Sequence, residues 1–426
     1  MAAKPFVMAL DRGLTRAATQ QELWLARFTG AAPEAGELPL DSKVVTLAQQ
    51  AASQGRPLYL LAENPHLARA LLERAQLDAC VIDLNGLRGD SRLKSLRRLI
   101  GDDAFEFAGA APLDQPIRRA AGVDDPVTRL LRVDTVLGLW RSLRPHHWIK
   151  NLLIFLPLLA AQKWQESSAL AQASAAFGVF CLTCSAIYIV NDLFDLRDDR
   201  RHPHKRYRPL AAGQLKPATA LLAALLLLGT GIALAGLWIP SGHFLALTLT
   251  YAVVALLYSR WLKTLRFIDL FSLGALYTLR VAAGAAAIHI WPSFWLLALC
   301  LCLFTSLACA KRAAELVQAQ KNGLQGISRR RYQLQDLKAI RALGALTATG
   351  ACAVLIIYTS EKAPKLYANP YAVGLAALPL MLWVVHIWQK ATAGQIREDP
   401  VLFALRDAKS WLLLAVLLLM FVLAQP

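Results

Sequence analysis

The chain has 426 residues, of which 56% are apolar, and a formal net charge of +17. Its mean hydropathy is +0.40, and soluble domains average only about 45–50% apolar residues. These values exclude an ordinary soluble protein. Residues 1–140 are mixed and charged, whereas long apolar runs dominate from Trp148 onward. The composition therefore predicts a soluble N-terminal domain followed by a membrane domain.

The positive charge has three candidate partners: nucleic acid, a membrane surface or anionic substrates. Much of it lies in loops between apolar runs, which argues against nucleic acid. Residues Met1–Leu10 are too short for a signal peptide and lead into charged sequence. We therefore expect membrane lipids and anionic substrates as partners, and no cleaved signal sequence.

Nine stretches are long and apolar enough to cross a membrane, at about 20 residues each. They cover approximately residues 148–162, 172–190, 217–238, 242–259, 268–288, 291–310, 341–358, 370–389 and 408–424. The first is the weakest, because its start is polar and Pro157 would kink a helix. Loops after the odd-numbered spans hold only Lys163, Lys362 and Lys365, and the other loops are rich in Lys and Arg. This asymmetry predicts that the N-terminal domain and the basic loops face the cytoplasm.

The loop after the second span begins with an acidic half. Asp192, Asp195 and Asp199 fall at i, i+3 and i+7, so they share one face if the helix continues through them. Oxygen-only ligands suit Mg²⁺, which typically takes one or two carboxylates plus substrate phosphate oxygens. The alternative is a solvated loop end, but acidic groups at membrane depth are costly and tend to be functional. The three aspartates are therefore the predicted catalytic metal ligands.

Basic side chains follow in the same loop and after the sixth span. The first set supplies donors for further phosphates and consists of Lys205, Arg206 and Arg208. After the sixth span, Lys311 and Arg312 have two interpretations, phosphate binding or positive-inside anchoring. Lys311 and Glu315 have the i, i+4 spacing of a helical ion pair. For Arg329 and Arg330, farther along, we favour anchoring.

A third cluster lies in the fifth span and at its start. Tyr277, Arg280 and Gly284 share a helix face, and Asp269 precedes them. An arginine inside an apolar span needs an anionic partner. We favour a substrate phosphate over a structural carboxylate. Lys150 begins the first span, where it would either reach a phosphate or act as a snorkelling anchor.

Residues 140–426 resemble the UbiA-type polyprenyl transferases. The match rests on Asn191-Asp192-x-x-Asp195-x-x-x-Asp199, which corresponds to that family's first Asp-rich motif, at the cytoplasmic end of the second of nine spans. The resemblance implies an all-α, multi-pass membrane domain with nine transmembrane helices and Mg²⁺ as cofactor. Members usually carry a second Asp-rich motif near the fifth span. Here only Asp269 remains, and Leu273 stands four residues later.

That departure makes the chain similar to the branch of the family that makes polyprenyl-phosphate phosphoribose. Four segments carry this likeness: 144–151, 202–209, 277–280 and 311–315. The resemblance implies transfer of 5-phosphoribose from phosphoribosyl pyrophosphate to a polyprenyl phosphate, at the cytoplasmic (inner) membrane. The implied phosphate-binding residues are Lys150, Asn191, Lys205, Arg206, Arg208, Tyr277, Arg280, Lys311 and Arg312.

Two alternatives remain open. A prenyltransferase would move a polyprenyl chain from its diphosphate to an aromatic acceptor, and the lone Asp269 counts against it. A transporter would often show internal repeats and charges near the bilayer midplane. The chain has no convincing repeat, and its charges cluster at the predicted cytoplasmic side.

The N-terminal segment alternates short apolar runs with helical patterns. Candidate strands cover residues 5–10, 58–61, 79–82 and 105–107, and candidate helices cover residues 42–54 and 65–75. This alternation predicts a parallel α/β sheet. The predicted domains are therefore 1–125, a linker at 126–143, and the membrane domain at 144–426.

The same segment resembles the haloacid-dehalogenase-like phosphatases, but its catalytic pattern is broken. The nucleophile position holds Ala9, and only the second aspartate survives, as Asp11. The second-motif position holds Leu61, and the late acidic loop is also degenerate, with Asp114 at its end. Lys94 matches the motif lysine but cannot work alone. Without a carboxylate nucleophile no aspartyl-phosphate forms. We therefore expect an inactive domain that serves as a scaffold or holds copies of the chain together as a homo-oligomer.

Overall fold

The computed structural model describes residues 4–424, except for 12, 18, 30–33, 89, 110–113, 122–135, 203, 328–330, 362, 364–366 and 397–398. The chain divides into two compact units. The first contains Met1–Arg144 and Tyr188–Leu226, and the second contains Pro145–Ile187 and Leu227–Pro426. Arg329, Arg330, Lys362 and Lys365 lie outside the described residues, as does most of the predicted linker.

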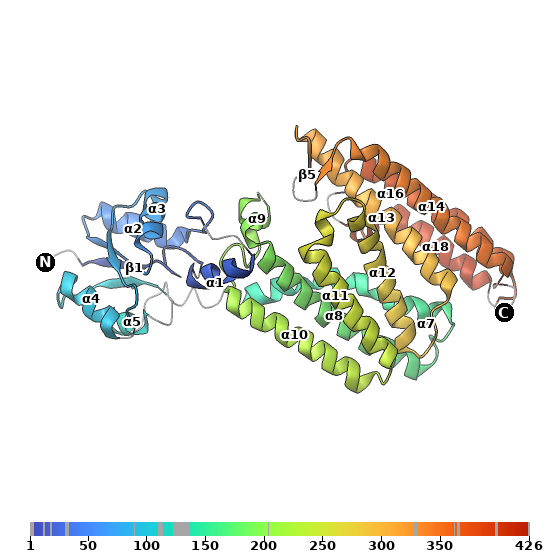
Figure 1. Cartoon of the computed structure of the whole chain (residues 1–426), viewed down its shortest axis with the longest axis horizontal. Coiled ribbons are helices and arrows are strands. Elements are labelled where there is room, and N and C mark those ends of the chain that lie inside the picture. Colours follow the sequence, from blue (N-terminus) through green and yellow to red (C-terminus); the bar gives the residue numbers. More distant parts are fainter. Residues whose placement is uncertain are drawn as a thin grey trace. The chain divides into compact units, whose positions relative to one another are not determined.

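The first unit contains a four-stranded parallel sheet. Its strands are β1 (Phe6–Ala9), β2 (Leu58–Ala62), β3 (Cys80–Asp83) and β4 (Glu106–Ala108), in the order β3-β2-β1-β4. Its helices are α1 (Thr19–Thr29), α2 (Ser42–Ser53), α3 (Pro65–Ala75), α4 (Asp90–Ile100) and α5 (Gln115–Ala121). Figure 1 shows α2 and α3 on one face of the sheet, and α4 and α5 on the other. The predicted small parallel α/β region is confirmed.

Apolar residues on both faces of the strands explain this arrangement. Met8 and Leu60 pack in the core beneath α2 and α3, and Val7 and Leu61 pack in the core beneath α4 and α5. A parallel sheet covered on both faces reads as continuous apolar runs rather than as an alternating pattern. The strands could therefore be predicted from the sequence as short apolar blocks.

The first unit also contains the segment after the second predicted span. There α8 (Ser167–Phe194) ends and α9 (Leu196–Arg201) begins, followed by η3 (Lys205–Tyr207) and the start of α10 (Pro217–Trp238). The predicted continuous helix is therefore interrupted at Asp195. Hydrogen bonds from Asp195 N to Asn191 O and from Asp199 N to Asp195 O still continue the helical pattern across the break.

The second unit is helical, and seven helical segments of the described residues are long and apolar enough to span a membrane. They include α11 (Gly242–Arg260), α12 (Ile268–Ala287), α13 (Phe294–Lys321), α14 (Asp336–Glu361) and the pair α15 (Pro370–Leu375) and α16 (Ala377–Thr392), with α8 and α10 as the other two. Two shorter helices, α17 (Pro400–Ala404) and α18 (Ala408–Leu423), end the chain. The chain is thus a multi-pass membrane protein.

The first predicted span does not form one long helix. Residues Pro145–Phe155 form the 3₁₀ helix η2, and Leu156–Ala160 form the short helix α7. Pro157 lies in the first turn of α7, where its missing N–H costs nothing. A regular helix through this position would lose a hydrogen bond and clash with the preceding turn. Lys150 therefore lies in η2, not at the start of a spanning helix.

Close helix packing positions η2 against α12. A Cβ atom added at Gly284 would lie 2.1 Å from the carbonyl oxygen of Ile154, so only glycine allows this approach. Helix α13 packs against α12, α14 and α16, and its Ser306 hydroxyl donates to the Gly344 carbonyl oxygen across the α13–α14 contact. The short strands β5 (Gly326–Ile327) and β6 (Tyr332–Gln333) form a hairpin between α13 and α14.

The substitution Gly284→Ala tests the role of this contact. The added methyl group must push η2 away from α12, and such overpacking costs about 1–3 kcal/mol. We expect a lower thermal unfolding midpoint for the purified full chain in detergent. Gly229→Ala in α10 is the matched control, because no atom lies within 4 Å of its added Cβ. Equal midpoints for the two variants would contradict the packing argument.

Candidate functional site

The Asp-rich motif is buried at the junction of α8 and α9. Asp192, Asp195 and Asp199 are each less than one-tenth exposed. Arg208 Nη1 donates to Asp192 Oδ1 at 3.1 Å and to Asp199 Oδ2 at 2.5 Å, which holds these two carboxylates on one side. Arg144 Nη2 adds a hydrogen bond of 2.5 Å to Asp192 Oδ1. The predicted shared face is therefore supported for Asp192 and Asp199.

The electrostatics around Asp199 favour a cation. Burial raises the pKa of the Asp199 carboxyl, Arg208 opposes this shift, and the nearby Asp192 adds to it. Among the described residues, no group of three or more His, Cys, Asp or Glu side chains forms a metal site by itself. Two carboxylates together with phosphate oxygens suffice for Mg²⁺. Asp192 and Asp199, which Arg208 brings together, supply carboxylate oxygens of the kind that such an ion binds.

The opposite side of α9 is held by acidic side chains from near the N-terminus. Arg200 donates to both carboxylate oxygens of Glu22, at 2.6 and 2.5 Å, and both side chains are buried. Arg197 and Arg201 form ion pairs with Glu34 and Glu37. Sequence reasoning missed these partners, because 178 residues separate Glu22 from Arg200.

The remaining predicted residues of this loop are more exposed. Lys205 and Arg206 lie in η3, and Arg206 Nη2 donates to the hydroxyl of Tyr207 at 2.8 Å. Asn191 precedes the motif near the end of α8 and is partly buried. Their binding of substrate phosphates stays a prediction, as does metal binding by the three aspartates.

In the second unit, three predicted residues converge on Asp399. Lys150 Nζ donates to Asp399 Oδ2 at 2.7 Å, Lys311 Nζ donates to the same oxygen at 3.3 Å, and the Tyr277 hydroxyl lies 3.2 Å from both oxygens. Asp399 also accepts from Val401 N and so caps α17. Sequence reasoning missed Asp399. The available signal was an Asp-Pro pair in a predicted cytoplasmic loop, typical of a helix start.

The Asp399 carboxyl stays ionised in this environment. Burial alone would raise its pKa, but the ammonium groups of Lys311 and Lys150 outweigh burial and hold the pKa well below the usual range. Among the described residues, two ammonium groups face this carboxylate, so Lys150, Lys311 and Asp399 together carry a net positive charge.

Arg280 is buried among polar groups of the second unit. It donates to Asn151 Oδ1 at 3.0 Å, to the Tyr251 hydroxyl at 2.6 Å and to the Leu276 carbonyl oxygen at 2.8 Å. Its guanidinium also lies over the Tyr277 ring, at 5.2 Å from the ring centre. These partners include an amide and a phenol, and the predicted phosphate contact of Arg280 stays a prediction.

Among the described residues of the second unit, Arg312 forms the most deeply buried ion pair. It donates to Asp269 Oδ2 at 2.7 Å, and both side chains have no exposed surface. Arg312 also pairs with Glu315, and the Tyr332 hydroxyl donates to Asp269. The expected ion pair between Lys311 and Glu315 is thus wrong: Glu315 turns to Arg312, and Lys311 turns to Asp399. Lys311 of α13 therefore pairs with the buried carboxylate at the start of α17, rather than with a residue of its own helix.

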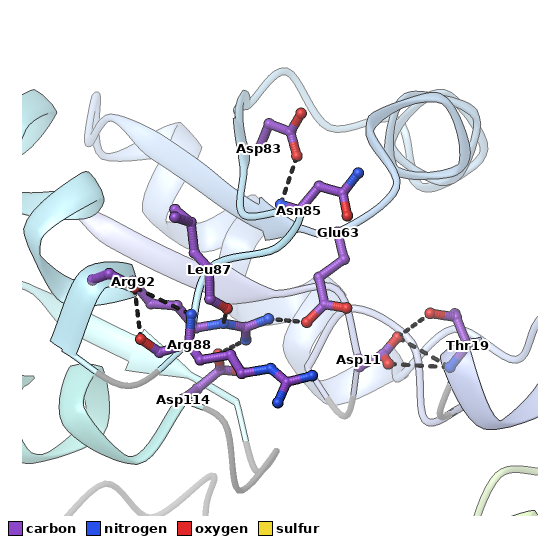
Figure 2. A network of polar contacts seen from close by, with 10 residues as sticks. Asp11, Thr19, Glu63, Asp83, Asn85, Leu87, Arg88, Arg92 and Asp114 are labelled. Carbon is purple, nitrogen blue, oxygen red and sulfur yellow. Dashed lines mark hydrogen bonds and ion pairs between the residues drawn. The ribbon is translucent and has the colours of Figure 1, made fainter.

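A separate polar network lies at the carboxyl ends of the sheet strands, as Figure 2 shows. Arg92 of α4 pairs with Glu63, which follows β2, and donates to Asp114 at 2.6 Å. Asp11, after β1, accepts from the Thr19 hydroxyl at 2.6 Å. Lys94, the predicted motif lysine, is exposed on α4. The buried Arg92, rather than Lys94, therefore lies at the carboxyl ends of the strands.

Comparisons with known proteins agree with this architecture. The model of the UbiA prenyltransferase family matches residues 152–405. The chain is 31% identical to the uncharacterized protein y4nM of Sinorhizobium fredii, over 94% of this chain and 82% of that protein. It is 32% identical to the decaprenyl-phosphate phosphoribosyltransferase of Mycolicibacterium smegmatis, over 64% of this chain and 87% of that protein.

Among solved structures, a UbiA homolog from Archaeoglobus fulgidus bound to GPP and Mg²⁺ has a TM-score of 0.51 at 17% identity. The match covers 66% of this chain and 99% of that one, and it shows a shared fold. The chain belongs to the UbiA prenyltransferase family and is a membrane-embedded transferase. The predicted resemblance to the phosphoribosyltransferase branch is likewise confirmed by the mycobacterial relative.

The substitution Arg92→Met tests the network at the sheet edge. It leaves Glu63 and Asp114 without their shared counter-charge, and breaking a buried ion pair costs about 3–5 kcal/mol. We expect faster hydrogen exchange of the β1 and β2 amides in the full chain. Arg98→Met, at an exposed position of the same helix, should change stability by no more than about 0.5 kcal/mol. Equal exchange in the two variants would show that the network does not stabilise the sheet.

Proposed function

We propose that the chain transfers 5-phosphoribose from phosphoribosyl pyrophosphate to a polyprenyl phosphate and releases diphosphate. The observation that carries this choice is Asp269. It is the remnant of the second acidic motif, and Arg312 and Tyr332 already bind it in a fully buried position. A second acidic cluster for a prenyl diphosphate is therefore disfavoured. The relatives named decaprenyl-phosphate phosphoribosyltransferase support the same choice.

The reaction needs anion binding more than a protein nucleophile. The bond between the anomeric carbon and the diphosphate oxygen breaks, and an oxygen of the acceptor phosphate bonds to that carbon. The acceptor is already anionic, so no general base is required. Mg²⁺ held by Asp192 and Asp199, with Asp195 beside them, would neutralise charge on the leaving diphosphate.

Arg208 links the carboxylates to the substrate in this proposal. Its guanidinium bridges Asp192 and Asp199. When a diphosphate arrives, the guanidinium turns to its oxygens in bidentate geometry, for which arginine is well suited. Lys205 and Arg206 add positive charge in the same segment, and the Asn191 amide adds neutral donors. Stabilisation of the developing negative charge is the main catalytic contribution.

The second cluster takes another phosphate group. Lys150, Tyr277 and Lys311 already surround one anionic group, the Asp399 carboxylate. A phosphoribosyl transferase handles a diphosphate, a 5-phosphate and an acceptor phosphate, so several cationic clusters are expected. Arg280 stays in the predicted set of phosphate-binding residues, whereas Arg312 is already fully buried against Asp269 and pairs with Glu315.

We further propose the orientation and the role of the N-terminal region. The chain lies in the cytoplasmic membrane, with residues 1–125 in the cytoplasm and nine membrane segments when η2–α7 and α18 are counted with the seven long helices. The domain that contains the sheet is an inactive relative of haloacid-dehalogenase-like phosphatases. Ala9 stands at the nucleophile position, and Arg92 pairs with Glu63 and Asp114 at the carboxyl ends of the strands. It acts as a scaffold or as a contact between copies of the chain.

The direct test incubates the purified full chain with phosphoribosyl pyrophosphate, Mg²⁺ and a polyprenyl phosphate. Mass analysis of the extracted lipid should show the added mass of one phosphoribosyl group. A parallel reaction offers a prenyl diphosphate and an aromatic acceptor. Product in the parallel reaction alone would overturn the proposal in favour of prenyl transfer.

The acidic motif gives a sharper prediction. Asp192→Asn and Asp199→Asn should each lower kcat at least about 10²-fold, because each removes charge from the site of leaving-group stabilisation. The matched control is Asp198→Asn, since Asp198 is the exposed neighbour of Asp199 in α9. Steady-state rates of lipid product formation provide the measurement. An Asp198 variant as damaged as the other two would contradict a specific role of the buried pair.

The N-terminal sheet gives a second prediction. The wild-type full chain should not hydrolyse p-nitrophenyl phosphate above the rate of a no-protein blank. Asp11→Asn should leave that result unchanged, because Asp11 accepts from Thr19 at the start of α1 rather than from a substrate. Hydrolysis by the wild type that disappears in the Asp11 variant would refute the inactive-domain proposal.

A further inference from the structure

The environment of Asp399 goes beyond what helix capping requires. One oxygen of a capping aspartate needs only the backbone N–H of its own helix, and here Val401 N supplies it at 3.1 Å. The other oxygen accepts from Lys150 of η2 and Lys311 of α13. The hydroxyl of Tyr277, from α12, reaches both. Four elements distant in sequence thus meet at one carboxylate.

The charges of Lys150, Lys311 and Asp399 do not cancel among themselves. Two ammonium groups face a single carboxylate, and the Arg280 guanidinium lies over the same Tyr277 ring that Lys150 approaches from 5.8 Å. Like charges held this close repel, and burial increases the repulsion. Asp399 offsets that repulsion and allows the two ammonium groups to stay adjacent.

The cluster can still accept an anion. An ammonium group has three donors, so Lys150 and Lys311 each keep donors after binding Asp399. The Lys311 side chain is 24% exposed, whereas those of Lys150 and Asp399 are 10% and 9% exposed. An incoming phosphate therefore meets Lys311 first. Asp399 itself cannot bind the phosphate, because a carboxylate only accepts hydrogen bonds.

We propose that Asp399 is a positioning residue that holds the ammonium groups of Lys150 and Lys311 side by side, so that they bind one phosphate group of a substrate together. This inference rests on the proposed function for its substrate class. The bound phosphate group can belong to the sugar donor or to the lipid acceptor, since both carry phosphate. The shared chemistry is a phosphate monoester or diphosphate group between two lysines.

The first experiment measures phosphate binding without requiring turnover. Inorganic phosphate stabilises a protein that binds it in the folded state, so the thermal unfolding midpoint rises with its concentration. In the purified full chain, we expect Asp399→Asn to raise the half-saturating phosphate concentration at least about tenfold. This variant keeps the shape and the capping oxygen but loses the charge. Asp399→Glu should recover part of the affinity.

The matched control is Asp407→Asn. Asp407 also caps a helix, α18, through Ser410 N at 2.8 Å, and it contacts His386 at 2.9 Å instead of the two lysines. Phosphate binding should be unchanged in this variant. The double variant Asp399→Asn with Lys311→Met should bind phosphate no more weakly than Lys311→Met alone, because Asp399 acts through Lys311.

Kinetics then identify the substrate. KM should rise for either phosphoribosyl pyrophosphate or polyprenyl phosphate in Asp399→Asn, with a smaller change in kcat. If phosphate binding follows the expected pattern but no phosphoribosyl lipid forms, the positioning role stands and the proposed function fails. Phosphate binding by Asp399→Asn that equals or exceeds that of the wild type overturns the positioning role, as does additive loss in the double variant. A wild type that phosphate does not stabilise also overturns it.

Discussion

In each of the two units, the candidate functional residues depend on the pairing of buried carboxylates with basic side chains. Asp192 and Asp199 share Arg208, Asp269 is bound by Arg312, and Asp399 is bound by two lysines. An unpaired charge at such positions would cost several kcal/mol, so each carboxylate fixes the cation beside it. The carboxylates therefore keep the basic side chains close to the positions where the proposed function requires them.

This pairing gives the three buried carboxylate sites different roles. Arg208 bridges carboxylates that suit a divalent cation, so a diphosphate that takes Arg208 also uncovers Asp192 and Asp199 for that cation. Metal and diphosphate should then strengthen each other's binding, by the reciprocity of coupled sites. Asp399 has lysine partners with spare donors, and it can stay in place while a phosphate binds. Asp269 is enclosed by Arg312 and Tyr332 and holds α12 against its neighbours.

The sequence predicted those features that depend on local pattern. Short apolar blocks marked the parallel strands, and long apolar runs marked the spanning helices. The prediction of one helix for the first span was wrong, because the chain breaks into η2 and α7 next to Pro157. Partner choice could not be predicted, because Asp399 lies 249 residues from Lys150, and local spacing wrongly favoured Glu315 for Lys311. The acidic motif was found because all of its members lie within eight residues.

The exchange at Arg208 can be measured directly with Mn²⁺ in place of Mg²⁺, by electron paramagnetic resonance of the free ion in a titration of the full chain. Phosphoribosyl pyrophosphate should tighten Mn²⁺ binding at least about tenfold beyond its own affinity for the ion. Arg208→Gln should bind Mn²⁺ more tightly than the wild type when substrate is absent. Equal Mn²⁺ affinity in wild type and variant, with no gain from the diphosphate substrate, would show that Arg208 does not exchange between carboxylates and substrate.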